Sequence, residues 1–524
     1  MSASNFDSAS FDSASQAQSI LQTARSLFYD RALVQLDGQY VGAVAAITSK
    51  RQSEAQAQEL NYNEIFMRDN VPVMIFLLLE GKSEIVRHFL DTCLKLQSNQ
   101  FQTLGIFPTS FVESDGGLVA DYGQRAIGRV SSVDASLWWP ILAHIYVQRT
   151  GDRAWASQPN VQRGIQQFLH LILHPWFRDA PTLHVPDGAF MIDRSLDVWG
   201  APLEIQVLLY GALLSAAKLI QLDLSEKGVC GDSAVRLHSP SDAFTQQQIH
   251  QFTYALAWVK RLRSYLLKHY WVNIKTVQVL RQRPTEQYGD EITNEYNIQT
   301  ESIPHWLQYW LGDRGGYLLG NIRTGRPDFR FFMLGNCLGA MFDVISPKQQ
   351  QALFQLIWHN QSSLIAQMPL RICHPPLEDT DWRHKTGFDR KNLPWCYHNG
   401  GHWPCLLWFL GVAILRHQRH HPQVASGHEP WGTSMLQSSY ELLLQRLPRQ
   451  KWAEYFDGPT GLWAGQQTRY YQTWTITGLL LIHHFLKVNP ADVDIMNLPT
   501  VKELSDIKIF GVPSVPIPGT GWSS

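Results

Sequence analysis

Apolar residues recur at the spacing of an α-helix over most of this chain, and this periodicity constrains the fold more than any other feature. In residues 70–98 the apolar positions follow a 3.6-residue repeat, and Gly81 divides the stretch into two predicted helices. Further helices are predicted at 135–149, 161–173, 203–221, 245–269, 330–343, 348–368, 403–416, 434–446 and 470–487. The alternation that is typical of strands is scarce and short, so the pattern predicts an all-α protein.

Several connections between the predicted helices are long and rich in glycine, proline, aspartate and aromatic residues. They cover residues 99–134, 174–202, 370–402 and 448–469. Long loops inside a compact domain usually carry function. Helices that bear such loops at one end favour a ring of helical hairpins around a pocket.

The predicted helices belong to one domain, which we expect to cover residues 26–498 of the 524. Residues 1–25 begin with a low-complexity stretch in which FDSAS occurs twice, so we expect a disordered N-terminal tail. Residues 499–524 are expected to form an irregular C-terminal tail, and the polar segment 225–242 a surface insertion.

Composition excludes several classes of partner. The formal net charge is −1 and no basic stripe stands out, so no nucleic-acid binding is expected. The longest apolar run, 404–415, has 12 residues, whereas a membrane-spanning helix needs about 20. Charged residues make up only 17%, and 19 Trp, 18 Tyr and 24 Phe are present. This balance favours concave aromatic surfaces, an interface between copies of the chain, or both.

The N-terminus and the cysteines indicate the compartment. The first residues carry acids and serines without a basic start or an apolar block, which is unlike a secretory signal. Six cysteines are thinly spread and none forms C-x-x-C, which is typical of reduced thiols. We therefore expect a cytoplasmic protein.

Motifs for cofactors and metals are incomplete. The GKS at 81–83 resembles the end of a P-loop, but Phe76 stands where the first glycine is required. HNGGH at 398–402 spaces two histidines as a zinc protease helix does, yet it lacks the glutamate. No glycine-rich dinucleotide fingerprint is present. We expect no cofactor and no metal.

Acids set among aromatics and arginines remain as candidates. Asp69, in FMRDN, could bind a pair of sugar hydroxyls or cap the helix that follows, and both interpretations stay open. Asp134 also precedes a helix, but capping does not explain the neighbouring arginines, Tyr122, Trp138 and Trp139. Aromatic faces of this kind stack against sugar rings while fixed polar groups orient the hydroxyls.

Two further carboxyls lie in apolar surroundings. Asp193 follows Phe190, Met191 and Ile192, and this predicts a desolvated carboxyl with a raised pKa; the alternative is an ion pair with Arg194. Glu454 lies beside Trp452, Tyr455 and Phe456. An acid buried among aromatics is costly unless it is paired or functional.

These groups belong to sequence blocks that run in order from about residue 60 to 488. They are FMRDNVP, AIGRV with VDASLWW, MIDRSLDVWGAPLEIQ, GGYLLGN with DFRFFMLGN, MPLRIC, PWCYHNGGHWP, and WAEYFDG with GQQTRYYQTWTI. Together the blocks resemble the neutral/alkaline invertases, glycoside hydrolase family 100, of plants and cyanobacteria. The resemblance implies an (α/α)6 barrel that hydrolyses sucrose to glucose and fructose with inversion of configuration.

The resemblance also implies roles. Asp193 matches the family's general acid and Glu454 its general base, although the residues alone leave the order of the two open. The hypothesis for the remaining positions is that they bind the substrate: Arg68, Asp69, Tyr122, Asp134, Trp138, Trp139, Arg194, His398, Trp403 and Arg469. The resemblance and the aromatic content favour a homo-oligomer such as a hexamer.

Three alternatives stay open at this point. The chain could be a trehalase-like glycosidase, a phosphorylase on a similar helical ring, or a sugar-binding scaffold without activity. Sucrose hydrolysis independent of phosphate distinguishes an invertase from the phosphorylase. The presence of both Asp193 and Glu454 argues against the scaffold.

Overall fold

The computed structural model describes most of the chain. The described residues are 9–47, 62–114, 116–125, 130–174, 178–179, 181–230, 242–281, 302–323, 326–425 and 431–509. Within them helices dominate, as predicted from the periodicity, and the strands are short antiparallel pairs.

Six helices whose residues are mostly buried form a closed cycle of contacts within the described structure. In the order of contact they are α3 (Asn70–Leu79), α5 (Val133–Thr150), α8 (Leu203–Glu226), α12 (Met333–Met341), α16 (Leu407–His420) and α19 (Thr473–His483), and α19 returns to α3. A helix that is apolar all round is stable only where other elements cover every face. These six therefore form the core of the protein.

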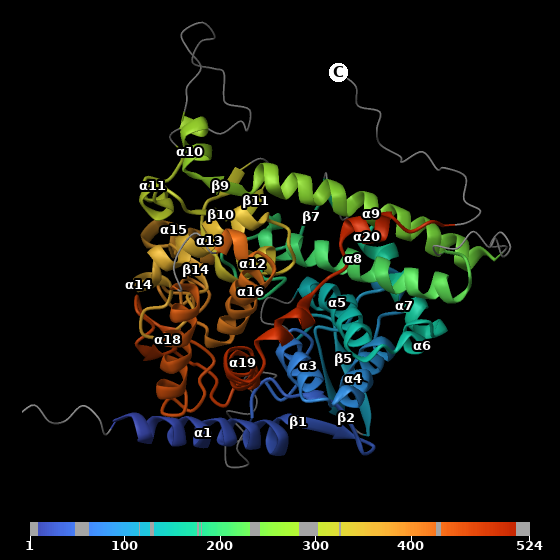
Figure 1. Ribbon diagram of the computed structural model, residues 1–524, viewed down its shortest axis with the longest axis horizontal. Coiled ribbons are helices and arrows are strands. Elements are labelled where there is room, and N and C mark those ends of the chain that lie inside the picture. The colour runs from blue at the N-terminus through green and yellow to red at the C-terminus, as the bar shows by residue number, and fades with distance from the viewer. Residues whose placement is uncertain are drawn as a thin grey trace, which may run out of the picture.

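A second set of helices packs on the outside of this ring. They are α4 (Ser83–Lys95), α7 (Pro159–Ile172), α9 (Ala243–His269), α13 (Pro347–His359), α18 (Trp431–Arg446) and α1 (Ala9–Leu27), and each contacts at least one ring helix. In α7 the buried residues include Val161, Ile165, Phe168, Leu169 and Ile172, which share one face at helical spacing. Figure 1 shows α1 and α9 at opposite edges of the molecule, with ring helices between them.

The other elements are short. The helical ones are α6 (Arg153–Ala156), α10 (Ile274–Arg281), α11 (Trp306–Leu311), α14 (Gln361–Leu364), α15 (Asp379–Thr386), α17 (Pro422–Ala425) and α20 (Val501–Ser505), with 3-10 or π turns η1 (Phe28–Ala32), η2 (Phe101–Thr103), η5 (Pro404–Leu406), η6 (His484–Val488) and η7 (Pro490–Met496). The strands pair as β1 (Leu33–Leu36) with β2 (Gln39–Ala43), β3 (Ile65–Phe66) with β4 (Ser110–Ser114) and β5 (Gly117–Asp121), β6 (Arg178–Asp179) with β7 (Thr182–Leu183), β8 (Ala201–Pro202) with β11 (Asn321–Arg323) and β12 (Arg326–Asp328), β9 (Trp271–Asn273) with β10 (Gly316–Leu318), β13 (Phe331–Phe332) with β14 (Cys373–His374), and β15 (Phe456–Asp457) with β16 (Trp463–Ala464). Half of these strands lie in the long loops that were predicted to carry function.

The prediction of a disordered tail over residues 1–25 is wrong for the part that the structure describes. Helix α1 begins at Ala9, and it contacts α19. Ala24 is fully buried, and Ala17, Ile20 and Leu21 pack against the core on the same side. The apolar positions recur at helical spacing and were outweighed by the low-complexity composition. Residues 1–8 lie outside the described part of the chain.

The C-terminal prediction is also corrected in part. Residues 499–524 were expected to be irregular, but α20 begins after a capping box formed by Thr500 and Glu503. Ile509 then forms a bridge with Cys230. Residues 510–524 and most of the predicted surface insertion, 231–241, lie outside the described residues.

One described helix, α8, is long and apolar enough to cross a membrane by length and composition alone. However, 94% of its apolar stretch is buried inside the protein, where it packs on α5, α9 and α12. The apolar character of α8 is explained by its place in the ring.

Candidate active site

A pocket lies where the segments that precede five of the six ring helices come together. It has about 740 Å³ of space between its atoms, part of it open to solvent. Its lining residues are Ala45, Tyr62, Phe66, Arg68, Asp69, Thr109, Arg125, Val130, Ser132, Gly188, Phe190, Met191, Asp193, Tyr397, His398, Trp403, Glu454 and Trp474. The long loops before α5, α8, α16 and α19 therefore meet here, as the sequence predicted.

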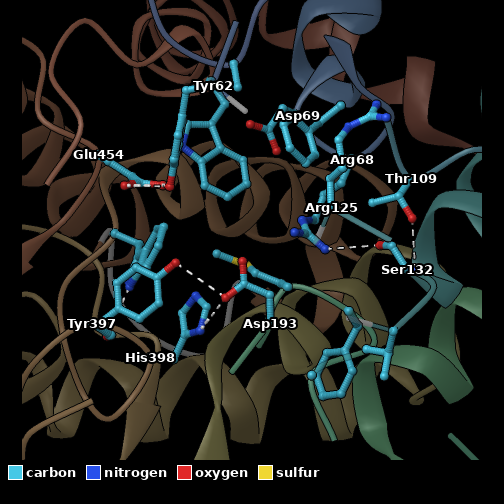
Figure 2. Close-up of a pocket in the computed structure, with 18 residues that line it drawn as sticks. Tyr62, Arg68, Asp69, Thr109, Arg125, Ser132, Asp193, Tyr397, His398 and Glu454 are labelled. Atoms are coloured by element: carbon cyan, nitrogen blue, oxygen red, sulfur yellow. Dashed lines mark hydrogen bonds and ion pairs between the residues drawn. The ribbon is translucent and has the colours of Figure 1, made fainter. Parts of the chain in front are cut away.

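Asp193 reaches the pocket from the loop before α8. Its side chain is 28% exposed, and its Oδ1 lies 3.4 Å from the hydroxyl of Tyr397 and 3.5 Å from Nδ1 of His398 (Figure 2). Burial raises the pKa of Asp193, while Arg68, Lys391 and Arg194 act in the opposite direction. The alternative interpretation, an ion pair with Arg194, is wrong because Arg194 pairs with Asp389 at 3.0 Å.

Glu454 reaches the same pocket from the loop before α19. Only 3% of the residue is exposed, and the hydroxyl of Tyr62 lies 3.2 and 3.5 Å from its two carboxyl oxygens. Gln472 donates to Oε1 at 3.5 Å. Burial raises the pKa of Glu454; Lys391 opposes this shift and Asp193 adds to it. Figure 2 shows Asp193 and Glu454 pointing into one common space.

Asp69 is a third carboxyl in this pocket. It occupies the N-cap position of α3, but its side chain makes no capping hydrogen bond, so the capping interpretation is wrong. No described residue donates a hydrogen bond to its carboxyl, and the side chain faces the cavity (Figure 2). Burial raises its pKa to about 7, and Arg68 opposes the shift. A buried carboxyl without a partner in the protein is suited to bind hydroxyl groups of a ligand.

Arg68 is held in place from behind. Asp134, which is fully buried, accepts a hydrogen bond from Nη1 of Arg68 at 2.7 Å. The same carboxyl also accepts from the hydroxyl of Ser132 and from the amide of Ala135. Asp134 does not line the pocket, so its part is to orient Arg68 rather than to contact a ligand.

One wall of the pocket is a stack of aromatic rings. The ring of His398 lies 3.9 Å from that of Tyr397 and 5.0 Å from that of Trp403, and Trp403 stacks on Tyr455 at 5.2 Å. Burial lowers the pKa of His398 well below its ordinary value, so the imidazole is neutral. Such a wall offers flat apolar faces and a neutral polar edge to a ligand.

Local backbone geometry fixes Tyr397 in this wall. Its φ of +46° lies in the left-handed region, which non-glycine residues adopt only where the surroundings enforce it. Asp457 accepts a hydrogen bond from the Tyr397 amide at 3.1 Å, and the Tyr397 carbonyl accepts from Gly401 at 2.9 Å. The loop before α16 is therefore built to hold this ring.

Six of the predicted residues line the pocket: Arg68, Asp69, Asp193, His398, Trp403 and Glu454. The prediction that Trp138 and Trp139 contact the substrate is wrong. Both are buried in the ring core, where Trp139 stacks on Phe107 at 4.7 Å and Trp138 lies near Phe342 and Phe409. They face inward because α5 is covered on all sides.

Four other predicted residues also lie outside the lining. Tyr122 donates its hydroxyl to the Leu96 carbonyl at 2.5 Å, away from the cavity. Arg194 and Asp134 form ion pairs behind the pocket wall. The guanidinium of Arg469 lies over the Tyr62 ring, 5.0 Å from its centroid. The prediction that these four residues bind the substrate directly is therefore wrong. They do not line the pocket, and they can only act on a ligand through other residues.

Sequence reasoning missed several residues that matter in this pocket. Tyr62, Tyr397 and Trp474 line it, and Lys391 lies directly behind it. Tyr397 and Trp403 share the PWCYHNGGHWP block, whose density of aromatics was the available signal. Tyr62 stands in an ordinary polar stretch and carried no signal. Among the described residues no group of three His, Cys, Asp or Glu side chains is placed to hold a metal ion.

Two carboxyls that face one cavity are the groups that cleave glycosidic bonds in most glycoside hydrolases. The protein is a glycoside hydrolase. The sequence profile of the alkaline and neutral invertases, glycoside hydrolase family 100, matches residues 25–490, and the chain belongs to this family. The resemblance seen in the sequence is thus confirmed.

Relatives at the sequence level carry the same family name. The chain is 35% identical to an alkaline/neutral invertase of Arabidopsis thaliana over 91% of its own length and 80% of that protein. It is 37% identical to a mitochondrial neutral/alkaline invertase of Oryza sativa subsp. japonica, over 86% of this chain and 68% of the relative. A cytosolic invertase of the same rice is 36% identical, over 91% and 80%.

Solved structures agree with the chain in fold. A glycosidase variant has a TM-score of 0.50 over 94% of this chain and 100% of that one, at 10% identity. At this identity the likeness concerns the fold alone.

Proposed function

We propose that this enzyme hydrolyses sucrose to glucose and fructose with inversion, with Asp193 as general acid and Glu454 as general base. The observation that carries the proposal is the meeting of the two carboxyls in one pocket, although they lie on different loops. Inverting pairs stand about 6.5–9.5 Å apart, which leaves room for one water molecule between acid, sugar and base.

In the proposed reaction, protonated Asp193 donates its proton to the oxygen that joins glucose to fructose. The bond from this oxygen to the fructosyl carbon breaks as water attacks that carbon from the opposite face, and ionised Glu454 takes the proton of the water. Burial favours the protonated form of Asp193 by raising its pKa. Tyr62 faces both oxygens of Glu454 and favours its ionised form.

The pocket also favours water over phosphate as the nucleophile. Glu454, ionised in the proposed reaction, faces the cavity, and a carboxylate repels an anionic nucleophile. We propose that Arg68, Asp69 and His398 hold the sugar hydroxyls and that Trp403 packs against a ring face. Asp134 and Arg469 support this arrangement indirectly.

The arrangement of helices fits the finer fold assignment, an (α/α)6 barrel. The six buried helices close a ring, and six partly exposed helices pack around it. We propose a single domain of this architecture. A cytoplasmic location is proposed from the six free cysteines, of which Cys396 alone is not fully buried. A homo-oligomer such as a hexamer is proposed as the assembly.

The assignment of the two carboxyls is tested by isosteric substitution. Asp193→Asn and Glu454→Gln should each lower kcat on sucrose by about 10²–10⁴-fold or more, because each removes one proton-transfer step. Asp381→Asn and Glu441→Gln, which change exposed acids, are the matched controls and should leave kcat unchanged. A correctly folded Glu454→Gln enzyme, judged by circular dichroism, with near-normal kcat would contradict the assignment.

The stereochemistry and the broken bond are tested separately. Sucrose carries a β-fructofuranosyl unit, so inversion at the fructosyl carbon releases α-fructofuranose first, which proton NMR detects before mutarotation. In ¹⁸O-labelled water the label should appear in fructose. Label in glucose, or β-fructofuranose as the first product, would refute the proposed mechanism.

A further inference from the structure

Each of the two carboxyls faces a tyrosine hydroxyl of its own. The hydroxyl of Tyr62 donates to Glu454, at 3.2 and 3.5 Å from the two oxygens, and that of Tyr397 donates to Asp193 at 3.4 Å. The two tyrosines come from different loops, one before α3 and one before α16. The pocket thus repeats one arrangement at two carboxyls (Figure 2).

A positively charged side chain lies over each of the two tyrosine rings. The guanidinium carbon of Arg469 lies 5.0 Å from the centroid of the Tyr62 ring, and Nζ of Lys391 lies 4.1 Å from that of Tyr397. Both distances are within the range of cation–π contacts. Lys391 is buried and is also 5.4 Å from the ring of Tyr455, the residue that follows Glu454.

These two cations differ from the arginines around the pocket. Arg68, Arg125 and Arg194 are each neutralised by an acid of their own: Asp134, Glu64 and Asp389. Within the described part of the chain, neither Lys391 nor Arg469 forms an ion pair with a carboxylate. Their charge is therefore available to the tyrosines and to the pocket.

We propose that Tyr62 and Tyr397 are positioning residues, each with a cation over its ring: Tyr62, under Arg469, acts on Glu454, and Tyr397, under Lys391, acts on Asp193. This inference rests on the proposed function, in which Glu454 must be ionised and Asp193 must lose its proton. In both cases the form of the carboxyl that the tyrosine stabilises is the carboxylate.

The chemistry of the phenol supports this assignment. Burial raises the pKa of Tyr62 and of Tyr397 well above the ordinary value, so both hydroxyls keep their protons and act as donors. A hydrogen bond donated to a carboxylate favours its ionised form. A cation over the ring draws electron density from the phenol, which makes the hydroxyl a stronger donor.

Other charged groups also act on the same two carboxyls. Arg68, Arg194 and Lys391 lower the pKa of Asp193, and Lys391 also lowers that of Glu454. The negative charges of Asp193, Glu454 and Asp69 oppose one another's ionisation. His398 is neutral, and the carboxyl of Asp457 accepts hydrogen bonds from two backbone amides. Lys391 acts on both carboxyls, whereas each tyrosine donates to one.

The test is the pH dependence of kcat/KM on sucrose for Tyr62→Phe and Tyr397→Phe. The acidic limb reports the base and the alkaline limb the acid. Loss of the Tyr62 hydroxyl raises the pKa of Glu454, so the acidic limb should move to higher pH by about half to one unit. Loss of the Tyr397 hydroxyl should move the alkaline limb to higher pH by a similar amount.

Two further variants complete the experiment. Tyr122→Phe removes a hydroxyl outside the pocket and should leave both limbs in place. Lys391→Met removes the charge that both carboxyls experience, so both limbs should move to higher pH and the optimum should become more alkaline. Circular dichroism of each variant verifies the fold.

The outcomes separate this inference from the proposed function. If the two limbs respond in exchanged order, the one-to-one pairing holds but Asp193 and Glu454 have exchanged roles. If each tyrosine variant moves both limbs alike, or moves neither, the pairing is overturned while the acid and base assignment stands. A purely structural role would lower the rate at every pH without moving a limb.

Discussion

At the scale of single residues, Asp69 shows how a ligand site is maintained at the expense of stability. Its pKa of about 7 exceeds the ordinary 3.8, so the folded state binds the proton more tightly than the unfolded state. The protonated carboxyl thus contributes to the free energy of unfolding. This contribution is fully present below about pH 4 and is lost as the pH rises to about 7.

Asp69→Asn should therefore stabilise the protein at alkaline pH. The gain in the free energy of unfolding should be larger at pH 8 than at pH 5, by about 2–3 kcal/mol. Urea denaturation at the two pH values measures this. Sucrose hydrolysis should fall at the same time, since the carboxyl that faces the cavity is lost. Equal gains at both pH values would show that Asp69 is not held in its protonated form.

The neighbours of a residue in the sequence were enough to predict some of the residues that line the pocket. Asp193 and Glu454 stand among apolar neighbours, and this local signal pointed to desolvated carboxyls. Trp138 and Trp139 had an equally rich context, but α5 buries them in the ring. Tyr62 and Lys391 could not be found, because they acquire their place only when distant loops meet. The direction of a side chain is decided by packing, which local composition does not report.

At the scale of elements, α1 shows that a segment of unpromising composition can be part of the core. Ala24 is fully buried, and Arg25 forms an ion pair with Glu80 at 2.6 Å. The ring of Phe28, just after the helix, packs edge-on against Phe76 of α3 at 5.5 Å. Helix α1 thus covers α3 and α19 together.

Ala24→Leu should destabilise the protein, because the larger side chain does not fit at a fully buried position. Overpacking of this kind costs about 1–3 kcal/mol in the free energy of unfolding. Gln22→Leu, at an exposed position of the same helix, is the matched control and should change stability little. Urea denaturation compares the two. Equal stability of the two variants would show that α1 is not docked as described.

Helices were predictable to within a few residues where their apolar repeat was long. The stretches 203–221 and 403–416 correspond to α8 and α16. The strands escaped prediction because each described strand has only two to five residues, too few for a clear alternating pattern. Their pairs satisfy backbone N–H and C=O groups of the segments between the helices.

At the scale of the whole molecule, the described surface carries large apolar side chains that a lone chain would leave in water. Phe101 is 98% exposed and Tyr309 85%. The proposed hexamer should have a mass of about 360 kDa, six chains of 59.9 kDa, in size-exclusion chromatography with light scattering. A single species at the mass of one chain would refute the assembly.

From the sequence pattern alone, only the class of fold could be predicted, and not the order of helices in the ring. Periodicity and loop lengths favoured helical hairpins around a pocket, but they contain no information on which helices touch. The closure of α19 on α3 joins residues near opposite ends of the chain. Such contacts are decided by tertiary packing, and it was the resemblance to a family that supplied the architecture.

This closure has a consequence for biosynthesis. The hydrogen bond between Tyr62 and Glu454 spans 392 positions, so nothing like the finished pocket exists while the ribosome is still making the middle of the protein. Contacts between distant positions slow folding, because a long stretch of chain must be ordered before they form. A nascent chain therefore cannot complete its sugar-cleaving centre before Glu454 has been synthesised.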